Sequence, residues 1–316
     1  MPIELDVEAR RENFDERGYL LLNEDVAKNV DKEALNRWRS GLHHFEVIGH
    51  SERRQLRQLG AIEKARALKI TSLEPHLLKD MTHTRRGLKY DFLSSELKID
   101  TAISETHLVS AHRYDTHVIE LIDKNHGSLI LDCGAGLRPV YYDNVVNYDI
   151  VDYETTDVIG VAEALPFKSG TFDGIISIAV LEHVRDPFKC ASELMRALKS
   201  GGRIVCAVPL LAPYHGYPHH YFNMTHQGIR ALFGDALNVE FHEVIDSLLP
   251  IWALTWIVQS WADGLTEDVR NEFLGQPVRA LMENASTLVE KRWVRELPRE
   301  RNFDLACGTL LIGQKR

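Results

Sequence analysis

Residues 129–136, which read LILDCGAG, constrain the fold of this 316-residue chain more than any other segment. The apolar start predicts a short buried strand, Asp132 stands at its end, and a Gly-x-Gly turn follows. Gly134 and Gly136 carry no Cβ, so the backbone can turn sharply there and a ligand can approach it closely. In an open α/β sheet, ligands bind beyond the carboxyl ends of the strands, where this turn would lie. A carboxylate directly before the turn would repel a dinucleotide's pyrophosphate, and it favours a ligand that carries a cationic amine.

Further elements follow in the order expected of an α/β fold. A helix over 116–125 should pack on the sheet. Another over 186–202 should begin with Asp186 as its N-cap and end at two glycines. Only residues 137–144 separate the Gly turn from the next strand, which is too few for a full crossover helix. The remaining strands are expected at 145–150, 157–161, 174–180, 203–209, 238–246 and 305–315.

Four motifs stand in order along the middle of the chain. They are LILDCGAG (129–136), VVNYDIVD (145–152), AEALPFKSGTFDGIISIAVLEHVRDP (162–187) and LKSGGRIVCAVP (198–209). This set resembles the class I S-adenosylmethionine-dependent methyltransferases, most closely the small-molecule branch with Leu-Pro-Phe and Leu-Glu-His-Val motifs. The resemblance implies an α/β fold, namely a Rossmann-like seven-stranded mixed sheet with helices on both faces and an antiparallel last strand. It also implies S-adenosyl-L-methionine as the cofactor.

The two ends of the chain are less well covered by the resemblance. Residues 1–105 carry apolar residues at three- and four-residue steps among many charges, which predicts a helical N-terminal region. We expect a methyltransferase domain over 106–316, with a helical insertion at 247–300 before the last strand. The insertion contains SLLPIWALTWIVQSWADGL, with three tryptophans at helical spacing. A buried helix or a homodimer contact through the insertion is the first interpretation, a substrate lid the second and an interfacial membrane helix the third.

By the same resemblance, residues around the first turn would hold the cofactor. Gly134, Ala135 and Gly136 would form the turn beneath the ligand. Asp132 would receive the ligand's amino group, directly or through water. Tyr114, from the segment before the first helix, would fold over the sulfonium; otherwise it caps the helix face and packs.

The second and third strands would bind the nucleoside. Asp149 would accept both ribose hydroxyls, because a carboxylate is an acceptor only and can take two donors. Asp152 is the competitor for this role. The family often has an acid directly before Ala162, and this chain has a valine there, so the backbone of Ala162 and the side chain of Glu163 are the expected adenine contacts. The expected contacts of the methionine portion are Ile178 and Ala179.

Histidines and tyrosines are concentrated in 209–225, the loop after the fifth strand. This loop should lie at the carboxyl end of the sheet, beside the transferable methyl group. If the acceptor is a hydroxyl, a general base helps, and histidine suits that role near neutral pH. His215 is the expected base. The other candidate catalytic residues are His219, His220 and Tyr221, the last to orient the substrate. The competing interpretation is a rigid aromatic loop whose histidines satisfy backbone groups.

A metal site is a further alternative. Glu182 and His183, together with the loop histidines, resemble the cluster that some ubiquinone-pathway O-methyltransferases use. The Leu-Glu-His-Val motif also occurs in relatives without a metal, where this pair begins the next helix and shapes the floor of the pocket. We therefore predict no metal ligand.

Composition narrows the classes of function. A formal net charge of −9 argues against a polyanion-binding surface, and so against a nucleic-acid partner. Hydrophobic content of 44% and charged content of 26% are ordinary for a soluble globular protein. Four well-separated cysteines form no zinc ribbon and fit a reducing compartment. The charged N-terminus reads as no secretory signal and no apolar run reaches ~18–20 residues, so we expect a cytoplasmic protein without a membrane span.

These patterns predict an enzyme that transfers a methyl group from S-adenosylmethionine to a small-molecule acceptor. The expected acceptor is a hydroxyl of a sugar, a glycan precursor or a secondary metabolite, attacked in line with help from a His base. Two alternatives stay open. The shortened crossover and the valine before Ala162 favour a cofactor-binding module without catalysis. A nicotinamide-dependent dehydrogenase is disfavoured by Asp132 and by Leu137, which stands where a third glycine would be.

Overall fold

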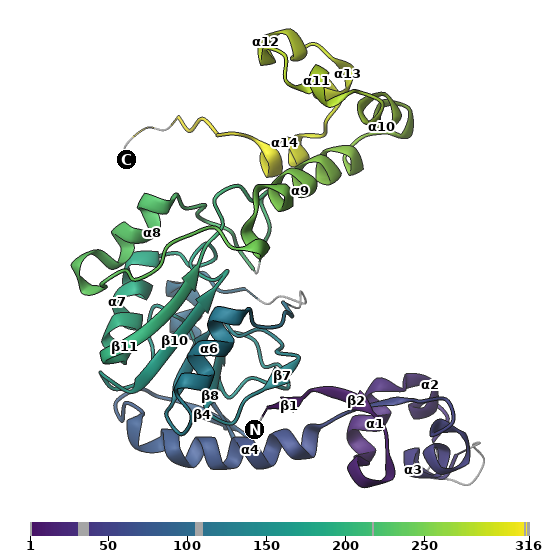
Figure 1. The fold of residues 1–316 in the computed structure, drawn as a ribbon, viewed down its shortest axis with the longest axis vertical. Helices are drawn as coiled ribbons and strands as arrows, with labels where there is room; N and C mark the ends of the chain where they lie inside the picture. Colours follow the sequence, from purple (N-terminus) through teal and green to yellow (C-terminus); the bar gives the residue numbers. More distant parts are fainter. Residues whose placement is uncertain (1, 31–37, 105–109, 217, 313, 315–316) are drawn as a thin grey trace. The chain divides into compact units, whose positions relative to one another are not determined.

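The computed structural model describes all residues except 1, 31–37, 105–109, 217, 313 and 315–316. The chain consists of two compact units, Met1–Ala207 and Val208–Arg316. The boundary between these units differs from the domain boundary expected after residue 105. The expected domain boundary stays a prediction. Figure 1 follows the chain from purple at the N-terminus to yellow at the C-terminus.

The first unit is built on a seven-stranded sheet, which confirms the predicted Rossmann-like mixed sheet. Its strand order is β11-β10-β6-β8-β9-β5-β4, and every neighbouring pair is parallel except β4 and β5. Buried parallel strands read as continuous apolar runs, which is why β6, β8, β9 and β10 were visible in the sequence. The bounds are β4 Thr84–Arg86, β5 Lys89–Asp91, β6 Ile130–Cys133, β8 Val145–Asp149, β9 Val158–Ile159, β10 Phe172–Ile178 and β11 Leu198–Ala207.

Two predicted strands are wrong, and two strands that were not predicted complete the seven-stranded sheet. The described residues of 238–246 and 305–315 form no strand. The sheet instead grows at its opposite edge, where Tyr90 of β5 pairs with Val158 of β9. A hairpin that turns at Gly87, with φ +61°, then adds β4 as the antiparallel strand. The mixed character of the sheet therefore comes from the N-terminal region and not from the end of the chain.

Helices α6 (Thr116–Lys124) and α7 (Pro187–Ala197) cover the two faces of this sheet (Figure 1). The Asp115 side chain caps α6 by accepting from the N–H groups of His117 and Val118. Helix α6 then packs Val118, Leu121 and Ile122 against β6, β8 and β10. Each fully buried aliphatic side chain of this kind is worth about 1.5–3 kcal/mol. Helix α7 ends at Ala197, not at the predicted glycine pair, because Leu198 already begins β11.

Helix α4 (Leu59–Leu73) crosses the amino ends of the strands and buries charge on its inner face. Arg66 Nε and Lys69 Nζ donate to the two oxygens of Asp157 at 3.0 and 2.7 Å. The Tyr141 hydroxyl and the backbone N–H of Asn147 donate to the same carboxylate at 2.5 and 2.9 Å. Asp157 directly precedes β9, so this fully buried cluster fixes α4 to the start of the central strands.

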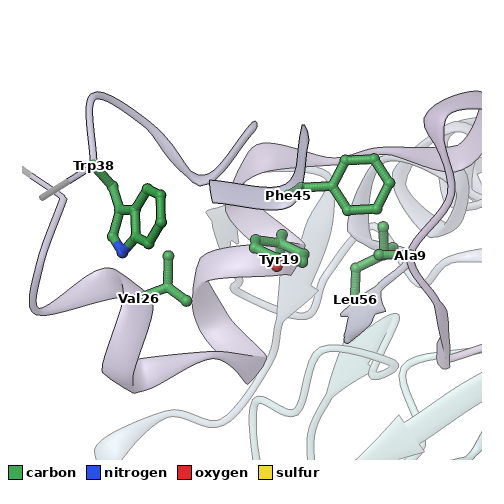
Figure 2. Packing of buried hydrophobic residues seen from close by; sticks show 6 residues of the cluster. All are labelled: Ala9, Tyr19, Val26, Trp38, Phe45 and Leu56. Carbon is green, nitrogen blue, oxygen red and sulfur yellow. The ribbon is translucent and has the colours of Figure 1, made fainter. Parts of the chain in front are cut away.

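The rest of the first unit is a small N-terminal subcore with a few short elements. Ala9, Tyr19, Val26, Trp38, Phe45 and Leu56 pack together as Figure 2 shows. The predicted helical character of 1–105 holds for part of it, since short strands alternate with the helices. The bounds are β1 Ile3–Glu4, β2 Asp6–Glu8, β3 Gln55–Arg57, β7 Val140–Tyr141, α1 Glu16–Leu22, α2 Glu24–Ala27, α3 Gly41–His44 and α5 Ser95–Asp100.

The second unit is helical over the predicted insertion. Ala262, Leu265, Val269, Phe273, Trp293 and Leu297 form its core. Trp261 of α9 packs against this core, whereas Trp252 is 62% exposed, so the helix is buried along only one face. None of the helices in the described part of the chain has the length and apolar content that crossing a bilayer requires. The bounds are α8 His226–Phe233, α9 Pro250–Asp263, α10 Glu267–Leu274, α11 Val278–Leu281, α12 Ala285–Leu288, α13 Arg292–Arg295 and α14 Arg299–Leu305.

Candidate functional site

The Gly turn has the backbone conformation that its sequence predicts. Gly134 and Gly136 have φ +77° and +63°, a region that costs other residues roughly 1–2 kcal/mol. The N–H groups of Gly134 and Ala135 donate to the Tyr148 carbonyl at 2.8 and 3.1 Å, which bends the turn over β8. A Cβ on Gly136 would collide with the Ser110 carbonyl oxygen, so the segment before α6 lies against the turn.

Asp149 lies at the carboxyl end of β8, directly beside this turn. Its Oδ2 accepts from the Gly136 N–H at 2.7 Å and its Oδ1 accepts from the Val151 N–H at 2.9 Å. Each carboxylate oxygen keeps a further lone pair, so the group can still accept two hydroxyls. Burial raises the pKa of Asp149 to about 6. Asp152, the competitor, is instead engaged by Lys89 Nζ at 2.5 Å, a contact that favours Asp149 as the ribose acceptor.

Asp149→Ala should weaken binding of S-adenosylhomocysteine by about 1.5–3 kcal/mol, because hydroxyls lose a charged acceptor. Asp152→Ala is the matched control, since that carboxylate already pairs with Lys89. Titration calorimetry of both variants decides between them, and normal binding by Asp149→Ala with loss in the control would overturn the assignment. Asp149 is ionised above its pKa of about 6, so affinity in the wild type should fall as pH drops through that value.

Asp132 lies in a buried ion pair that the sequence did not predict. Arg138 Nε donates to Asp132 Oδ2 at 2.7 Å and Nη2 donates to Oδ1 at 3.2 Å, while the side chains are 3% and 0% exposed. The Tyr114 hydroxyl also donates to Oδ2, at 2.5 Å, and the guanidinium lies 4.4 Å from the centre of its ring. Both expected cofactor contacts, Asp132 and Tyr114, are thus hydrogen-bonded to each other directly, and Arg138 contacts both of them. The one feature of the sequence that could have indicated this ion pair is the arginine within the shortened crossover at 137–144.

The expected adenine and methionine contacts end the next two strands. Ala162 is buried beyond β9, and Glu163 Oε1 accepts from the Arg185 N–H at 3.3 Å, which ties that loop to the one after β10. Burial raises the pKa of Glu163. Ile178 packs with the α6 cluster, and exposed Ala179 has φ +55°. A non-glycine residue held in the left-handed region is typical of functional sites, where the surrounding structure over-determines it.

Glu182 and His183 lie in the turn before α7, so the expectation that they begin this helix is wrong. Glu182 is fully buried, and neither of its oxygens has a hydrogen-bond partner among the described residues. Burial raises the pKa of Glu182 to about 7. His183 Nε2 lies 3.8 Å from Glu182 Oε1.

The histidine loop belongs to the second unit, and its side chains form two pairs. The rings of His215 and His220 have centres 4.3 Å apart, and Trp256 of α9 lies 5.0 Å from His215. His219 pairs instead with Tyr221, at 5.5 Å between ring centres. The four expected catalytic residues thus include two ring pairs, His215 with His220 and His219 with Tyr221. Their position beside the methyl group stays a prediction.

Two comparisons place the middle of the chain among known proteins. Residues 133–206 match the family described as a methyltransferase domain. An uncharacterized protein of Methanocaldococcus jannaschii is 33% identical over 91 residues, which are 25% of this chain and 40% of that protein. The match therefore spans less than two thirds of that relative's length.

Two solved structures are similar at low identity. A SAM-dependent methyltransferase of Thermotoga maritima is 19% identical with a TM-score of 0.27, over 34% of this chain and 62% of the other. Haemonchus contortus phosphoethanolamine N-methyltransferase 2, solved with S-adenosyl-L-methionine, is 14% identical with a TM-score of 0.33, over 60% and 49%. The motifs and the Gly turn lie within or beside the matched segment, and residues 133–206 form the core of a methyltransferase domain.

Proposed function

We propose that the chain is a methyltransferase that uses S-adenosyl-L-methionine to methylate a hydroxyl of a small molecule. Sugars, glycan precursors and secondary metabolites are the expected classes of acceptor. The observation that carries the proposal is the Asp149 carboxylate at the end of β8, hydrogen-bonded to the N–H of Gly136 in the positive-φ turn. A ligand with a ribose and an adjacent flexible chain fits this combination of a carboxylate acceptor and a glycine turn.

The residues present fit the cofactor in chemistry. Asp149 would hold the ribose, the turn at 134–136 would lie beneath the ligand, and Ala162 and Glu163 would border the adenine. When bound, S-adenosylmethionine supplies a methyl group on an already activated sulfonium. Residues Ile178 and Ala179 would border its methionine portion. The protein then has to hold the acceptor in line and exclude water.

The amino group of the ligand would meet a carboxylate that is already paired. Arg138 occupies both oxygens of Asp132, so a direct contact competes with a buried ion pair. A carboxylate has more than two acceptor positions, so one additional donor, directly or through water, is compatible with the geometry. In this proposal Tyr114 acts on the ligand through Asp132, to which its hydroxyl is bound.

The hydrogen bonding of His215 selects the tautomer that a neutral imidazole base needs. Its Nδ1 lies 2.8 Å from the Pro213 carbonyl, which only accepts, so Nδ1 carries a proton and donates it. In a neutral imidazole the other nitrogen, Nε2, is then the acceptor. His215 Nε2 would take the proton of the acceptor hydroxyl as oxygen attacks the methyl carbon. His219, His220 and Tyr221 would shape the acceptor site.

S-adenosylhomocysteine should raise the melting temperature of the protein, because it binds the folded state only. At 100 times its Kd the gain is about 2.7 kcal/mol. Differential scanning fluorimetry checks this, with NAD as the control ligand. If NAD raised the melting temperature and S-adenosylhomocysteine did not, the protein would instead be assigned to the nicotinamide-dependent enzymes.

A screen of hydroxyl and amine acceptors with methyl-labelled cofactor tests the reaction itself. Transfer to a hydroxyl compound supports the proposal, and transfer only to amines moves the activity to N-methylation. Binding of cofactor without transfer to any acceptor class would favour the non-catalytic module. Asp149→Ala is the negative control, since it should lose transfer together with cofactor binding.

A further inference from the structure

A short chain of hydrogen bonds links His215 to a residue eight positions later in the loop. The His215 backbone N–H donates to His220 Nδ1 at 3.2 Å. His220 Nε2 lies 3.0 Å from Asn223 Oδ1, and Asn223 Nδ2 donates to the Ala212 carbonyl at 3.0 Å. All of these groups lie in the second unit, within 212–223, so the chain of bonds is local.

The donor and the acceptor of each of these hydrogen bonds follow from the last group in the series, the Ala212 carbonyl. A backbone carbonyl only accepts, so the Ala212 carbonyl fixes the amide of Asn223 with Nδ2 towards it. Asn223 Oδ1 must then accept, and His220 Nε2 must carry the proton that it donates. His220 Nδ1 is therefore unprotonated, as it must be to accept from the His215 N–H. The arrangement needs a neutral His220 with its proton on Nε2.

We propose that His220 and Asn223 are positioning residues, which hold His215 in place by binding its backbone rather than acting on the substrate themselves. The inference rests on the proposed function, in which His215 is the base. It removes His220 from the candidate bases, since one ring nitrogen holds the His215 backbone and the other holds Asn223. It also gives Asn223 a role that its sequence position alone did not suggest.

The surroundings of His220 favour its neutral form. Two titratable side chains among the described residues face its ring: His215, at 4.3 Å between centres, and Tyr214, stacked at 5.9 Å. Burial lowers the pKa of His220, and His215 lowers it further, against the opposing effect of Asn223. Protonated His220 would set an Nδ1–H against the His215 N–H. The bond to His215 should therefore be present at high pH and lost as pH falls through the pKa of His220.

Nitrogen-detected NMR of the ¹⁵N-histidine protein tests the arrangement without any substrate. The chain has 15 histidines, so His215→Gln and His220→Gln variants assign the two rings. We expect the Nε2–H tautomer for His220 and the Nδ1–H tautomer for His215 at alkaline pH, with the pKa of His220 below the ordinary histidine value of ~6.5. His219→Gln is the matched control and should leave both signals in place. An Nδ1–H tautomer of His220 would overturn the inference.

Substitutions give the second test. Asn223→Asp should raise the pKa of His220 by about 1 unit or more, because it adds a negative charge at its Nε2. His220→Asn keeps an acceptor near the position of Nδ1, whereas His220→Phe keeps the ring and loses the acceptor. With an identified acceptor, His220→Phe should lower kcat roughly 10–100-fold with little change in KM for the cofactor, and His220→Asn should recover most of the loss.

The positioning role of His220 and the role of His215 as base can be contradicted separately. Equal loss in His220→Asn and His220→Phe, with unchanged tautomers, would mean that His220 itself handles the proton. The expected tautomers together with full turnover by His215→Ala would leave the arrangement intact and remove the base from the proposed function. Full turnover by His220→Phe with loss in His215→Ala would reject only the positioning role.

Discussion

Asp157→Ala is expected to lower the melting temperature of the first unit by roughly 6–20 °C. Asp157 is the one carboxylate that meets both Arg66 and Lys69 in the buried cluster under the sheet. Removing one partner of a buried ion pair typically costs about 3–5 kcal/mol, because the remaining charge stays buried without compensation. For units of this size each kcal/mol shifts the midpoint by roughly 2–4 °C.

Glu63→Ala on the same helix is the matched control. Glu63 pairs with Arg17 at 2.5 Å, but both side chains are largely exposed, so the loss should be about 0–1 kcal/mol. Circular dichroism melts of the two variants and the wild type measure the difference. Equal midpoints for Asp157→Ala and the wild type would show that α4 is not held by this cluster.

His215→Ala should lower turnover by roughly 10²–10⁴-fold, the usual contribution of a positioned general base. Affinity for S-adenosylhomocysteine should stay nearly unchanged, because the residues expected to bind the cofactor are elsewhere. The measurement is single-turnover kinetics with an identified acceptor, paired with calorimetry on the same protein sample.

His219→Ala is the comparison variant for this loop, since the His219 ring contacts the Tyr221 ring. Loss of turnover and cofactor affinity together in His215→Ala would assign a structural role to this histidine. Turnover lost in the control and retained in His215→Ala would transfer the role of base to His219. An amine acceptor, neutral at working pH, would need no base, and both variants would then retain activity.

The central strands could be predicted because each is a buried apolar run flanked by turn residues. Residues 129–133 and 145–150 are of this kind, and β6 and β8 form within them. The polar residues at their ends, Asp132 and Asp149, could be found for the same reason: they interrupt the run where a parallel strand must stop.

The edge of the sheet could not be predicted by these means. Strands β4 and β5 read TRR and KYD, which are too short and too charged to show a strand period. The pairing of β5 with β9 depends on contacts distant in sequence. The segment 238–246 alternates apolar and polar residues, yet Val239, Phe241 and Val244 are exposed in the structure. Local alternation thus predicted a strand in a segment that forms none in the structure.

Side-chain partners were the least accessible part of the site. Arg138 is six residues from Asp132, but only the fold of the shortened crossover brings its guanidinium back to that carboxylate. The direction of the bonds around His220 likewise depends on a carbonyl at Ala212. The spacing of residues along the sequence does not predict hydrogen bonds of this kind.

The cluster around Asp157 also sets the order in which the chain can assemble on a ribosome. Lys69 and Arg66 are made first, and the carboxylate that neutralises them follows 88 and 91 residues later. At about 5–20 residues per second, α4 waits roughly 4–18 s for its counter-charge. During that interval its cationic face cannot be buried, so docking of α4 has to follow synthesis of Asp157, which directly precedes β9.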